Sequence, residues 1–225
     1  MKTFAALFDL DGTLIDTYDA HFFAWKAVCV PFGIDVTAER FKRSFGRTNP
    51  PIIRDLWAEC DLEEPSDELI ETVANDKEAL FRTELSRAFL PMENAAALLH
   101  SLANTGWKTA IGTSAPQANL DQGIDGLQVG HIINATVCGD EVLHGKPDPE
   151  VFLACATKLD TPPKMCIVIE DAPAGVEAAK RGGMASIGIA SKGRTRDELA
   201  DADLVIDSLS ELSPEILANL IQRND

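Results

Sequence analysis

The sequence predicts an α/β fold: a doubly wound (Rossmann-like) parallel-sheet core with an inserted helical segment. Three observations support this prediction. Short apolar runs alternate with helix-like segments from residue 91 onward, a pattern typical of a parallel sheet covered on both faces. A further apolar run closed by acids and glycine occupies residues 3–10. Between them, residues 19–87 have helical spacing and helix-forming composition.

Each strand of the core is expected to be a short apolar run bounded by charge, glycine or proline. The expected strands are residues 3–10, 108–112, 135–138, 166–169, 185–189 and 204–206. The expected helices of the core are residues 93–102, 150–158 and 174–181. In the inserted segment, prolines at 31, 50, 51 and 65 divide the chain into several short helices. The core is therefore assigned residues 1–15 and 88–225, and the helical lobe residues 16–87.

Composition and charge narrow the functional class. The chain has 225 residues and a net charge of −16, which argues against nucleic acid and anionic membrane surfaces as partners. Its apolar runs are too short to span a membrane, and its N-terminus lacks a secretory layout. Five scattered cysteines indicate neither a disulfide framework nor a zinc site. We therefore expect a cytoplasmic protein, although the local basic excess over residues 39–48 is compatible with a small anionic substrate.

Polar residues directly after apolar strands are the candidates for a site, because ligands of an open parallel sheet bind at the carboxyl ends of its strands. Asp9 and Asp11 follow the first expected strand. Two acids this close repel each other unless a cation lies between them or one is protonated. A hard dication such as Mg²⁺ prefers oxygen ligands of this kind. Gly12 permits a tight turn out of the strand.

Two further acids, Glu170 and Asp171, follow the expected strand 166–169 and precede a helix. Taken alone, they are equally consistent with a cap of that helix. Together with Asp9 and Asp11, they are better explained as the remaining ligands of the metal.

The other two strand ends carry groups that can bind an anion. Thr113 and Ser114 offer hydroxyls and backbone N–H groups, although the pair is also typical of an ordinary helix N-cap. Lys146 stands between Gly145 and Pro147, where a rigid loop can present a fixed ammonium to a carboxylate and a phosphate. An exposed turn lysine would have the same local sequence. The order of all four segments favours a site, because one cleft at the edge of the sheet can collect them.

These segments resemble the four motifs of the haloacid dehalogenase-like hydrolase superfamily. The motifs are FDLDGTLIDT, the Thr-Ser pair after a strand, GKPDPE and IEDAPAGVEAA. The resemblance covers nearly the whole chain, and the first and fourth motifs are highly specific. The inserted segment is similar to the superfamily's helical cap domain, and its AHFFAWKA and FGRTN most resemble the β-phosphoglucomutase-like phosphatases and mutases. The resemblance thus implies a catalytic core and a cap with the boundaries given above.

Carried over residue by residue, the resemblance implies a role for each candidate. Asp9 would be the nucleophile, and Asp11 the acid that protonates the leaving oxygen and then the base that activates water. Mg²⁺ would be held by Asp9, Asp11 and Asp171, with Glu170 in support. The phosphate would be bound by residues of three motifs: Gly12, Thr113, Ser114 and Lys146.

In the cap, the resemblance implies that His21 and Trp25 lie at the junction with the core, where His21 could sense closure. A structural role on a helix face is equally consistent with His21. Arg47 is the cap's candidate for substrate contact. Where the mutase pattern has an arginine in the cap loop, this chain has Asn49. Where that pattern has Ser-Lys after the second motif, this chain has residues 115–116, Ala-Pro.

The loss of these cations removes charge-assisted contacts that a mutase needs to retain a bisphosphate. We therefore expect a monomeric Mg²⁺-dependent phosphatase for a small phosphorylated metabolite, a sugar-phosphate-like monoester, acting through an aspartyl-phosphate. The alternatives are a β-phosphoglucomutase-type sugar phosphomutase and an inorganic pyrophosphatase. A dehalogenase is disfavoured because such enzymes lack the second aspartate of the first motif. A non-catalytic binding protein is disfavoured because the candidate acids and lysine are all present.

Overall fold

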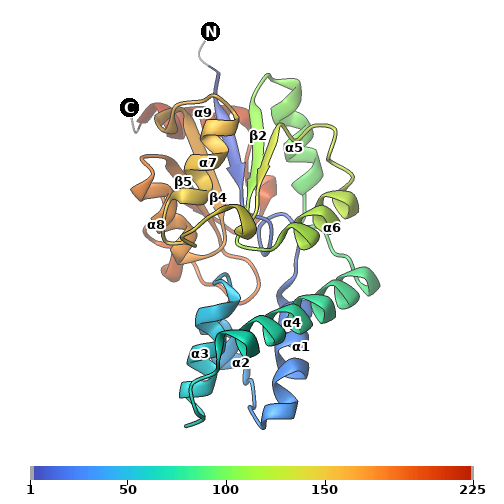
Figure 1. The fold of residues 1–225 in the computed structure, drawn as a ribbon. Coiled ribbons are helices and arrows are strands. Elements are labelled where there is room, and N and C mark those ends of the chain that lie inside the picture. Colours follow the sequence, from blue (N-terminus) through green and yellow to red (C-terminus); the bar gives the residue numbers. More distant parts are fainter. Residues whose placement is uncertain (1–2, 224–225) are drawn as a thin grey trace. The chain divides into compact units, whose positions relative to one another are not determined.

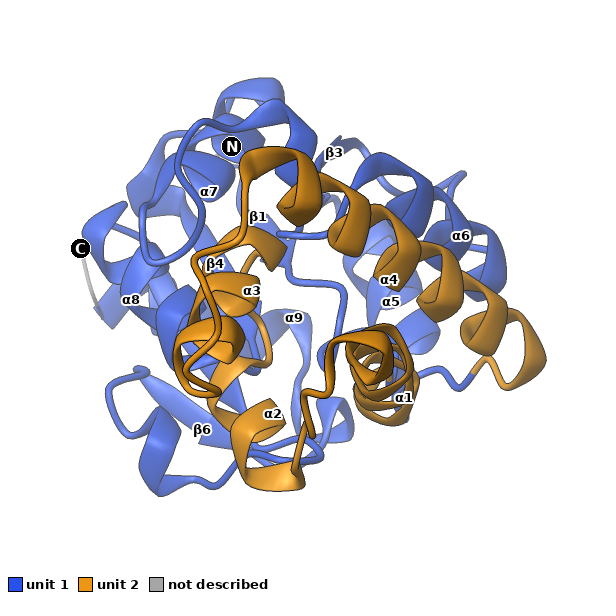
Figure 2. Ribbon diagram, turned by 60° about the horizontal axis from the view of Figure 1, so that its bottom comes forward, with its two compact units in different colours: residues 1–16, 90–225 blue, residues 17–89 orange. Residues whose placement is uncertain are grey.

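The computed structural model describes residues 3–223. The chain divides into two compact units, which Figure 2 shows in different colours. One, the α/β unit, comprises Met1–Asp16 and Leu90–Asp225; the other, the helical unit, comprises Thr17–Phe89. The boundaries between the units lie after residues 16 and 89. The boundaries expected from the sequence lay after residues 15 and 87.

The α/β unit contains a six-stranded sheet in the order β3-β2-β1-β4-β5-β6, and every neighbouring pair is parallel. The predicted fold class is thereby confirmed. The strands are β1 (Ala5–Phe8), β2 (Lys108–Gly112), β3 (Ala135–Val137), β4 (Cys166–Glu170), β5 (Ala185–Ile189) and β6 (Leu204–Ile206). The central strands β1, β4 and β5 are buried at every position, which explains why they read as continuous apolar runs instead of alternating ones.

Five α-helices accompany this sheet within the described residues (Figure 1). They are α5 (Ala95–Asn104), α6 (Gln117–Leu127), α7 (Glu150–Lys158), α8 (Pro173–Arg181) and α9 (Pro214–Arg223). Crossovers between parallel strands are right-handed. The chain adds β2 and β3 on one side of β1 and then β4 and β5 on the other. This reversal places α5 and α6 on the face opposite α7 and α8.

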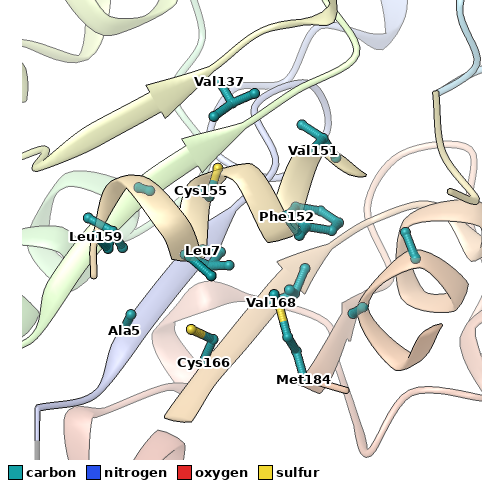
Figure 3. Packing of buried hydrophobic residues seen from close by; sticks show 14 residues of the cluster. Ala5, Leu7, Val137, Val151, Phe152, Cys155, Leu159, Cys166, Val168 and Met184 are labelled. Carbon is teal, nitrogen blue, oxygen red and sulfur yellow. The ribbon is translucent and has the colours of Figure 1, made fainter. Parts of the chain in front are cut away.

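Helix α7 crosses the middle of the sheet, as Figure 3 shows. Phe152 and Cys155 on this helix are fully buried and pack with Leu7 of β1 and Val168 of β4 in one apolar cluster. Burial of such side chains contributes about 1.5–3 kcal/mol each relative to leaving them exposed. This packing fixes the start of α7, and hence the loop that precedes it, against the central strands.

Most predicted elements agree with the structure within two residues, and two differences have a physical cause. The first strand is only four residues long because the chain turns sharply after Asp9 instead of continuing to residue 10. Helices α6 and α9 were not predicted as separate elements. Helix α6 contains two glycines, at positions 123 and 126, which lower helix propensity, and it forms because its apolar side packs on the unit's core.

The helical unit consists of α1 (Tyr18–Cys29), α2 (Ala38–Ser44), α3 (Asn49–Ala58) and α4 (Asp67–Arg87). Thr37 and Ser66 cap α2 and α4 by accepting hydrogen bonds from backbone N–H groups three residues later. An apolar cluster built around buried Trp25, Phe41 and Trp57 joins the four helices. Across residues 3–223 no helix combines the length and apolar character needed to cross a membrane.

Candidate active site

The candidate site lies where the chain reverses the direction in which it adds strands. Strand β1 has β2 on one side and β4 on the other, and ligand sites of open α/β sheets form at such switch points. Phe8 pairs with Ile169, so Asp9, directly after β1, lies beside Glu170, the last residue of β4. The backbone N–H of Asp9 still donates to the carbonyl oxygen of Ile169, at 3.0 Å. The sheet register therefore brings acids from two distant motifs together.

The turn after β1 sets the direction of the first motif. Gly12 has a φ of +79°, a left-handed conformation that glycine adopts without strain, and its N–H donates to the carbonyl oxygen of Ile15 at 2.8 Å. A Cβ at this position would overlap the carboxylate of Asp171. Asp9 is buried and Asp11 is half-buried. Gly12 thus serves both the turn and the close packing of the fourth motif on the first.

Lys146 joins the third motif to the first and fourth. Its Nζ donates to Asp9 Oδ1 at 2.5 Å and to Glu170 Oε1 at 2.6 Å, and its side chain is only 2% exposed. The ammonium also lies 4.8 Å from the centre of the Phe152 ring. Lys146 is therefore a fixed buried cation, and the alternative of an exposed turn lysine is wrong.

The loop that carries Lys146 is held by the first residue of α7. The Glu150 carboxylate accepts hydrogen bonds from the backbone N–H groups of Leu143 and His144, at 3.0 and 2.9 Å. The N–H of Glu150 in turn donates to Asp148 Oδ1 at 3.0 Å. Because α7 is anchored on the sheet, these bonds restrict the path of the loop toward Asp9.

Glu170 is 2% exposed and uses both carboxylate oxygens. Besides the bond from Lys146, it accepts a hydrogen bond from the N–H of Ala172 at 2.6 Å. A Cβ at Gly175 would overlap this carboxylate, so the first turn of α8 must carry glycine there. The helix-cap explanation thus accounts for part of what Glu170 does, and its bond to Lys146 accounts for the rest.

Asp171 is 1% exposed and contacts a loop that the sequence reasoning did not select. Ser191 Oγ donates to Asp171 Oδ2 at 3.2 Å, and Arg194 Nε lies 4.0 Å from the same oxygen. Both residues follow β5, which had been predicted correctly as a strand. Applying the rule of polar residues after apolar strands to this fifth strand end would have found Ser191.

The carboxylates of Asp9, Glu170 and Asp171 lie close enough to share one ion, with one oxygen of each within 4.8 Å of the others. Burial raises the pKa of Asp9 to about 7 against the lowering effect of Lys146, and the charges of Glu170 and Asp11 add to the rise. Burial likewise raises the pKa of Asp171 well above its usual range, with Glu170 adding to it and Arg194 opposing it. Three buried carboxylates thus face two buried cations, Lys146 and Arg194, and ionisation of all three carboxylates would leave an excess of negative charge.

Lys146 remains charged in this surrounding. Burial alone would lower the pKa of its ammonium, but the attraction of Asp9 and Glu170 outweighs burial and raises that pKa above its ordinary value. The donor set around it is all oxygen and net negative, which suits a hard dication such as Mg²⁺. The residues present therefore fit the metal that the sequence implied.

Thr113 and Ser114 follow β2, the other neighbour of β1. The N–H of Thr113 continues the pairing with β3 by donating to Val137, at 3.0 Å, and its Oγ1 accepts from the N–H of Ala115 at 3.1 Å. Helix α6 begins only at Gln117, with Pro116 as its N-cap. The ordinary N-cap explanation for the Thr-Ser pair is therefore wrong. The pair stands at the same edge of the sheet as Asp9.

The helical unit contains a buried polar cluster of its own. Lys77 Nζ donates to Glu78 Oε1 at 2.7 Å and lies 2.9 Å from Nδ1 of His21. The His21 ring stacks on Phe81 with centroids 3.9 Å apart, and the Lys77 ammonium is 5.4 Å from the centre of the Trp25 ring. The sequence reasoning missed Lys77 and Glu78. Their signal was a lysine midway between two buried apolar residues of one helix face, Val73 and Phe81.

The cap-loop candidates are both engaged with carboxylates of the helical unit. Arg47 Nη1 donates to Asp55 Oδ2 at 2.8 Å, and the Arg47 side chain is 38% exposed. Asn49, which stands where the mutase pattern has arginine, donates to Glu78 Oε1 at 2.8 Å. The structure thus places His21, Trp25 and Asn49 around one cluster and Arg47 outside it.

With this geometry in view, comparison with known proteins defines the class. The family profile of haloacid dehalogenase-like hydrolases matches residues 6–189, a span that includes every motif named above. The chain belongs to the haloacid dehalogenase-like hydrolase family, and the resemblance inferred from its motifs is confirmed.

Individual relatives show which members of this family the chain resembles. The chain is 28% identical over 214 residues to validoxylamine A 7'-phosphate phosphatase of Streptomyces hygroscopicus subsp. limoneus, covering 92% of this chain and 94% of the relative. It is 30% identical over 218 residues to β-phosphoglucomutase of Bacillus subtilis, covering 95% and 93%. Its fold matches a crystal structure of β-phosphoglucomutase from Clostridium difficile with a TM-score of 0.90 at 24% identity, covering 98% of each chain.

Proposed function

We propose that this protein is a Mg²⁺-dependent phosphatase that hydrolyses a small, sugar-phosphate-like monoester through an aspartyl-phosphate on Asp9. The observation that carries the proposal is the convergence of Asp9, Lys146, Glu170 and Asp171 where β1 and β4 end. Membership in a hydrolase family supports the reaction class. The relative named validoxylamine A 7'-phosphate phosphatase supports a small phosphate monoester as the substrate class.

The metal would be held by the Asp9 carboxylate, the backbone carbonyl of Asp11 and the Asp171 carboxylate, with Glu170 close to it. When bound, Mg²⁺ neutralises negative charge on the phosphate and on the acids that face it. Lys146 contributes a second cation beside Asp9, held without freedom to move away. Alignment and neutralisation of charge are the main requirements of phosphoryl transfer, and the observed excess of buried carboxylate matches the need for an additional cation.

The chemistry then proceeds in two displacements. An oxygen of Asp9 attacks phosphorus, and the bond from phosphorus to the leaving oxygen breaks while Asp11 gives that oxygen a proton. Asp11, now ionised, takes a proton from a water molecule that attacks the phosphorus of the aspartyl-phosphate. The bond between phosphorus and Asp9 breaks, and inorganic phosphate leaves. Thr113 and the N–H of Ser114 would hold the phosphoryl oxygens during both steps.

The helical unit is proposed as the cap that selects the substrate. Its buried cluster around His21 and Trp25 is one candidate for substrate contact, and Arg47 is another. The stacking of His21 on Phe81 also supports a structural role for that histidine. We further propose a monomeric, cytoplasmic protein whose partner is a small phosphorylated metabolite, with neither nucleic acid nor a membrane as a target.

The test is phosphate release from a panel of substrates in the presence of Mg²⁺. The panel comprises β-glucose 1-phosphate, glucose 6-phosphate, fructose 1-phosphate and pyrophosphate. Asp9→Asn should lower the rate on any active substrate by about 10⁴-fold or more, because a carboxamide cannot serve as the nucleophile. Asp207→Asn is the matched control, since Asp207 is 67% exposed and its carboxylate pairs with surface Arg196. Unchanged phosphate release by purified Asp9→Asn would refute the proposal.

A sugar phosphomutase is the second candidate, favoured by the 30% identity to the B. subtilis enzyme. Against it, Asn49 donates to Glu78 and Arg47 is paired with Asp55, so the cap loop offers less free positive charge for a second phosphate. Incubation with β-glucose 1-phosphate, Mg²⁺ and a trace of glucose 1,6-bisphosphate separates the two. Glucose 6-phosphate as product would favour the mutase, whereas free phosphate alone would favour the phosphatase.

A further inference from the structure

The loop after β5 reaches the candidate site although no motif of the sequence marks it. Strand β5 lies beside β4 in the sheet, and Ile169 pairs with Ile187. The carboxyl end of β5 therefore lies at the same edge of the sheet as Asp171, which follows β4. Residues 190–195 leave β5 at this edge, and two of their side chains turn back toward Asp171.

Ser191 makes a specific contact there. Its hydroxyl donates to Asp171 Oδ2 at 3.2 Å, both residues are at least nine-tenths buried, and a buried hydroxyl–carboxylate bond restricts the rotation of the carboxylate. Arg194, with a side chain 7% exposed, faces the same oxygen at 4.0 Å. The two groups come from one short loop and meet one atom of Asp171.

The backbone of this loop is well anchored. The N–H of Ala190 donates to Ile206 of the neighbouring strand β6 at 2.8 Å, and the N–H of Ser191 donates to Ile189 at 2.8 Å. The N–H of Arg194 then returns to the carbonyl oxygen of Ser191, at 3.0 Å. Ser191 is thus presented from a fixed backbone, which is what a residue that orients another side chain requires.

We propose that Ser191 is a positioning residue for the metal site: its hydroxyl holds the Asp171 carboxylate in the orientation that binds the divalent ion. This inference rests on the proposed metal-dependent function. Groups that hydrogen-bond to metal ligands typically change metal affinity 10–100-fold when they are removed. Asp171 also packs against the backbone of Gly12, so the carboxylate lies between the first motif on one side and Ser191 on the other.

Removal of the hydroxyl tests the proposal through metal affinity. Ser191→Ala should weaken Mg²⁺ binding about 10–100-fold, measured by titration calorimetry on the full chain without substrate. With the active substrate, the Mg²⁺ concentration for half-maximal rate should rise by the same factor, while kcat at saturating Mg²⁺ should stay within about threefold of the wild type. A merely structural role would lower stability without moving the Mg²⁺ requirement.

The chain offers a matched control in β5, the strand that precedes this loop. Ser186 of β5 is 1% exposed, and its Oγ donates to the Asp203 carboxylate at 3.1 Å. Ser186→Ala loses a comparable buried hydrogen bond and should leave the Mg²⁺ dissociation constant within about twofold of the wild-type value.

The outcomes separate this inference from the function on which it rests. If the wild-type protein binds Mg²⁺ and Ser191→Ala binds it equally well, the positioning role is wrong and the phosphatase proposal stands. An equal weakening in Ser186→Ala also overturns the positioning role, because the effect would then be general. If the wild-type protein neither binds Mg²⁺ nor releases phosphate, the proposed function itself fails.

Discussion

Each unit of the molecule contains a buried lysine that bonds to a carboxylate. The surroundings of these two lysines differ. In the α/β unit, Lys146 is 2% exposed and bonds Asp9 and Glu170. In the helical unit, Lys77 is 3% exposed and bonds Glu78. Both lysines are fixed by packing as well as by charge, since Lys146 lies over the ring of Phe152 and Lys77 over that of Trp25.

The pKa values of Asp9 and Glu78, one carboxyl partner of each lysine, shift in opposite directions. In the α/β unit the pKa of Asp9 is raised to about 7, because burial and neighbouring acids outweigh Lys146. In the helical unit burial also acts to raise the pKa of Glu78, but Lys77, His21 and a bond from Asn49 outweigh it and lower that pKa. In the first cluster the three buried carboxylates outnumber the two cations that face them, and raised carboxyl pKa values of this kind are typical of functional sites. The second satisfies its carboxylate internally and is typical of a structural network.

The largest expected effect on stability is in the helical unit. Lys77→Met should lower the free energy of unfolding by about 3–5 kcal/mol, because it leaves the buried Glu78 carboxylate without its cation. Chemical denaturation followed by tryptophan fluorescence measures this, since Trp25 and Trp57 both lie in the helical unit's apolar cluster.

The control is the double variant Lys77→Met with Glu78→Leu. Replacing both members of a buried ion pair by apolar residues is often neutral or stabilising, so most of the lost stability should return. A double variant as unstable as the single one would mean that the Lys77–Glu78 pair is not the source of the effect.

The next effect belongs to the α/β unit and depends on metal. Mg²⁺ at about 100 times its dissociation constant should stabilise the wild-type protein by about 2.7 kcal/mol. Asp171→Asn should abolish this stabilisation by removing a ligand. Without metal, the variant should be at least as stable as the wild type, because it relieves repulsion among buried carboxylates.

Thermal unfolding with and without Mg²⁺ checks this prediction, and Glu78→Gln serves as its counterpart in the helical unit. That variant should be less stable than the wild type and yet gain the full stabilisation from Mg²⁺. If Mg²⁺ stabilises Asp171→Asn as much as it stabilises the wild type, Asp171 is not a ligand of the ion. The contrast between the two clusters would then have no basis.

The smallest expected effect is a pH dependence of stability. The folded pKa of Glu78 lies below its unfolded value, so ionised Glu78 favours the folded chain above the unfolded pKa, about 4.3. That stability is lost as the pH falls through the folded pKa. Denaturation midpoints between about pH 3 and pH 6 should therefore fall less steeply with decreasing pH in Glu78→Gln than in the wild type. Parallel curves for the two proteins would contradict this assignment.

Most of the α/β unit could be predicted because its signals are local. Strands such as Lys108–Gly112 and Ala185–Ile189 were predicted to the residue, since a strand buried on both faces must be continuously apolar and must stop at polar or turn residues. The acids and the lysine were found because the carboxyl ends of such strands are predictable positions. Ser191 was missed because the rule of polar residues after apolar strands was not applied to the end of the fifth strand, and its contact with Asp171 is not apparent from the sequence.

The sequence was less informative for the helical unit. Lys77 and Glu78 look like ordinary surface residues in a long charged helix. The helical period places Lys77 between apolar Val73 and Phe81, but the groups that it contacts on that face depend on the neighbouring helices. Asn49 was recognised as a departure from the mutase pattern and Arg47 as a candidate for substrate contact. The carboxylates that engage them, Glu78 and Asp55, are distant or unremarkable in sequence.

The sequence by itself determined the class of fold, the family and the identity of the residues of the candidate site. Strand burial and motif spacing are local properties, and each can be recognised from a short segment of the chain. Only the tertiary structure decided which charges are neutralised. Lys146 meets Asp9 across 137 residues and Ser191 meets Asp171 across 20. Such pairings, and the pKa values they set, depend on the register of parallel strands and on burial, neither of which a linear pattern contains.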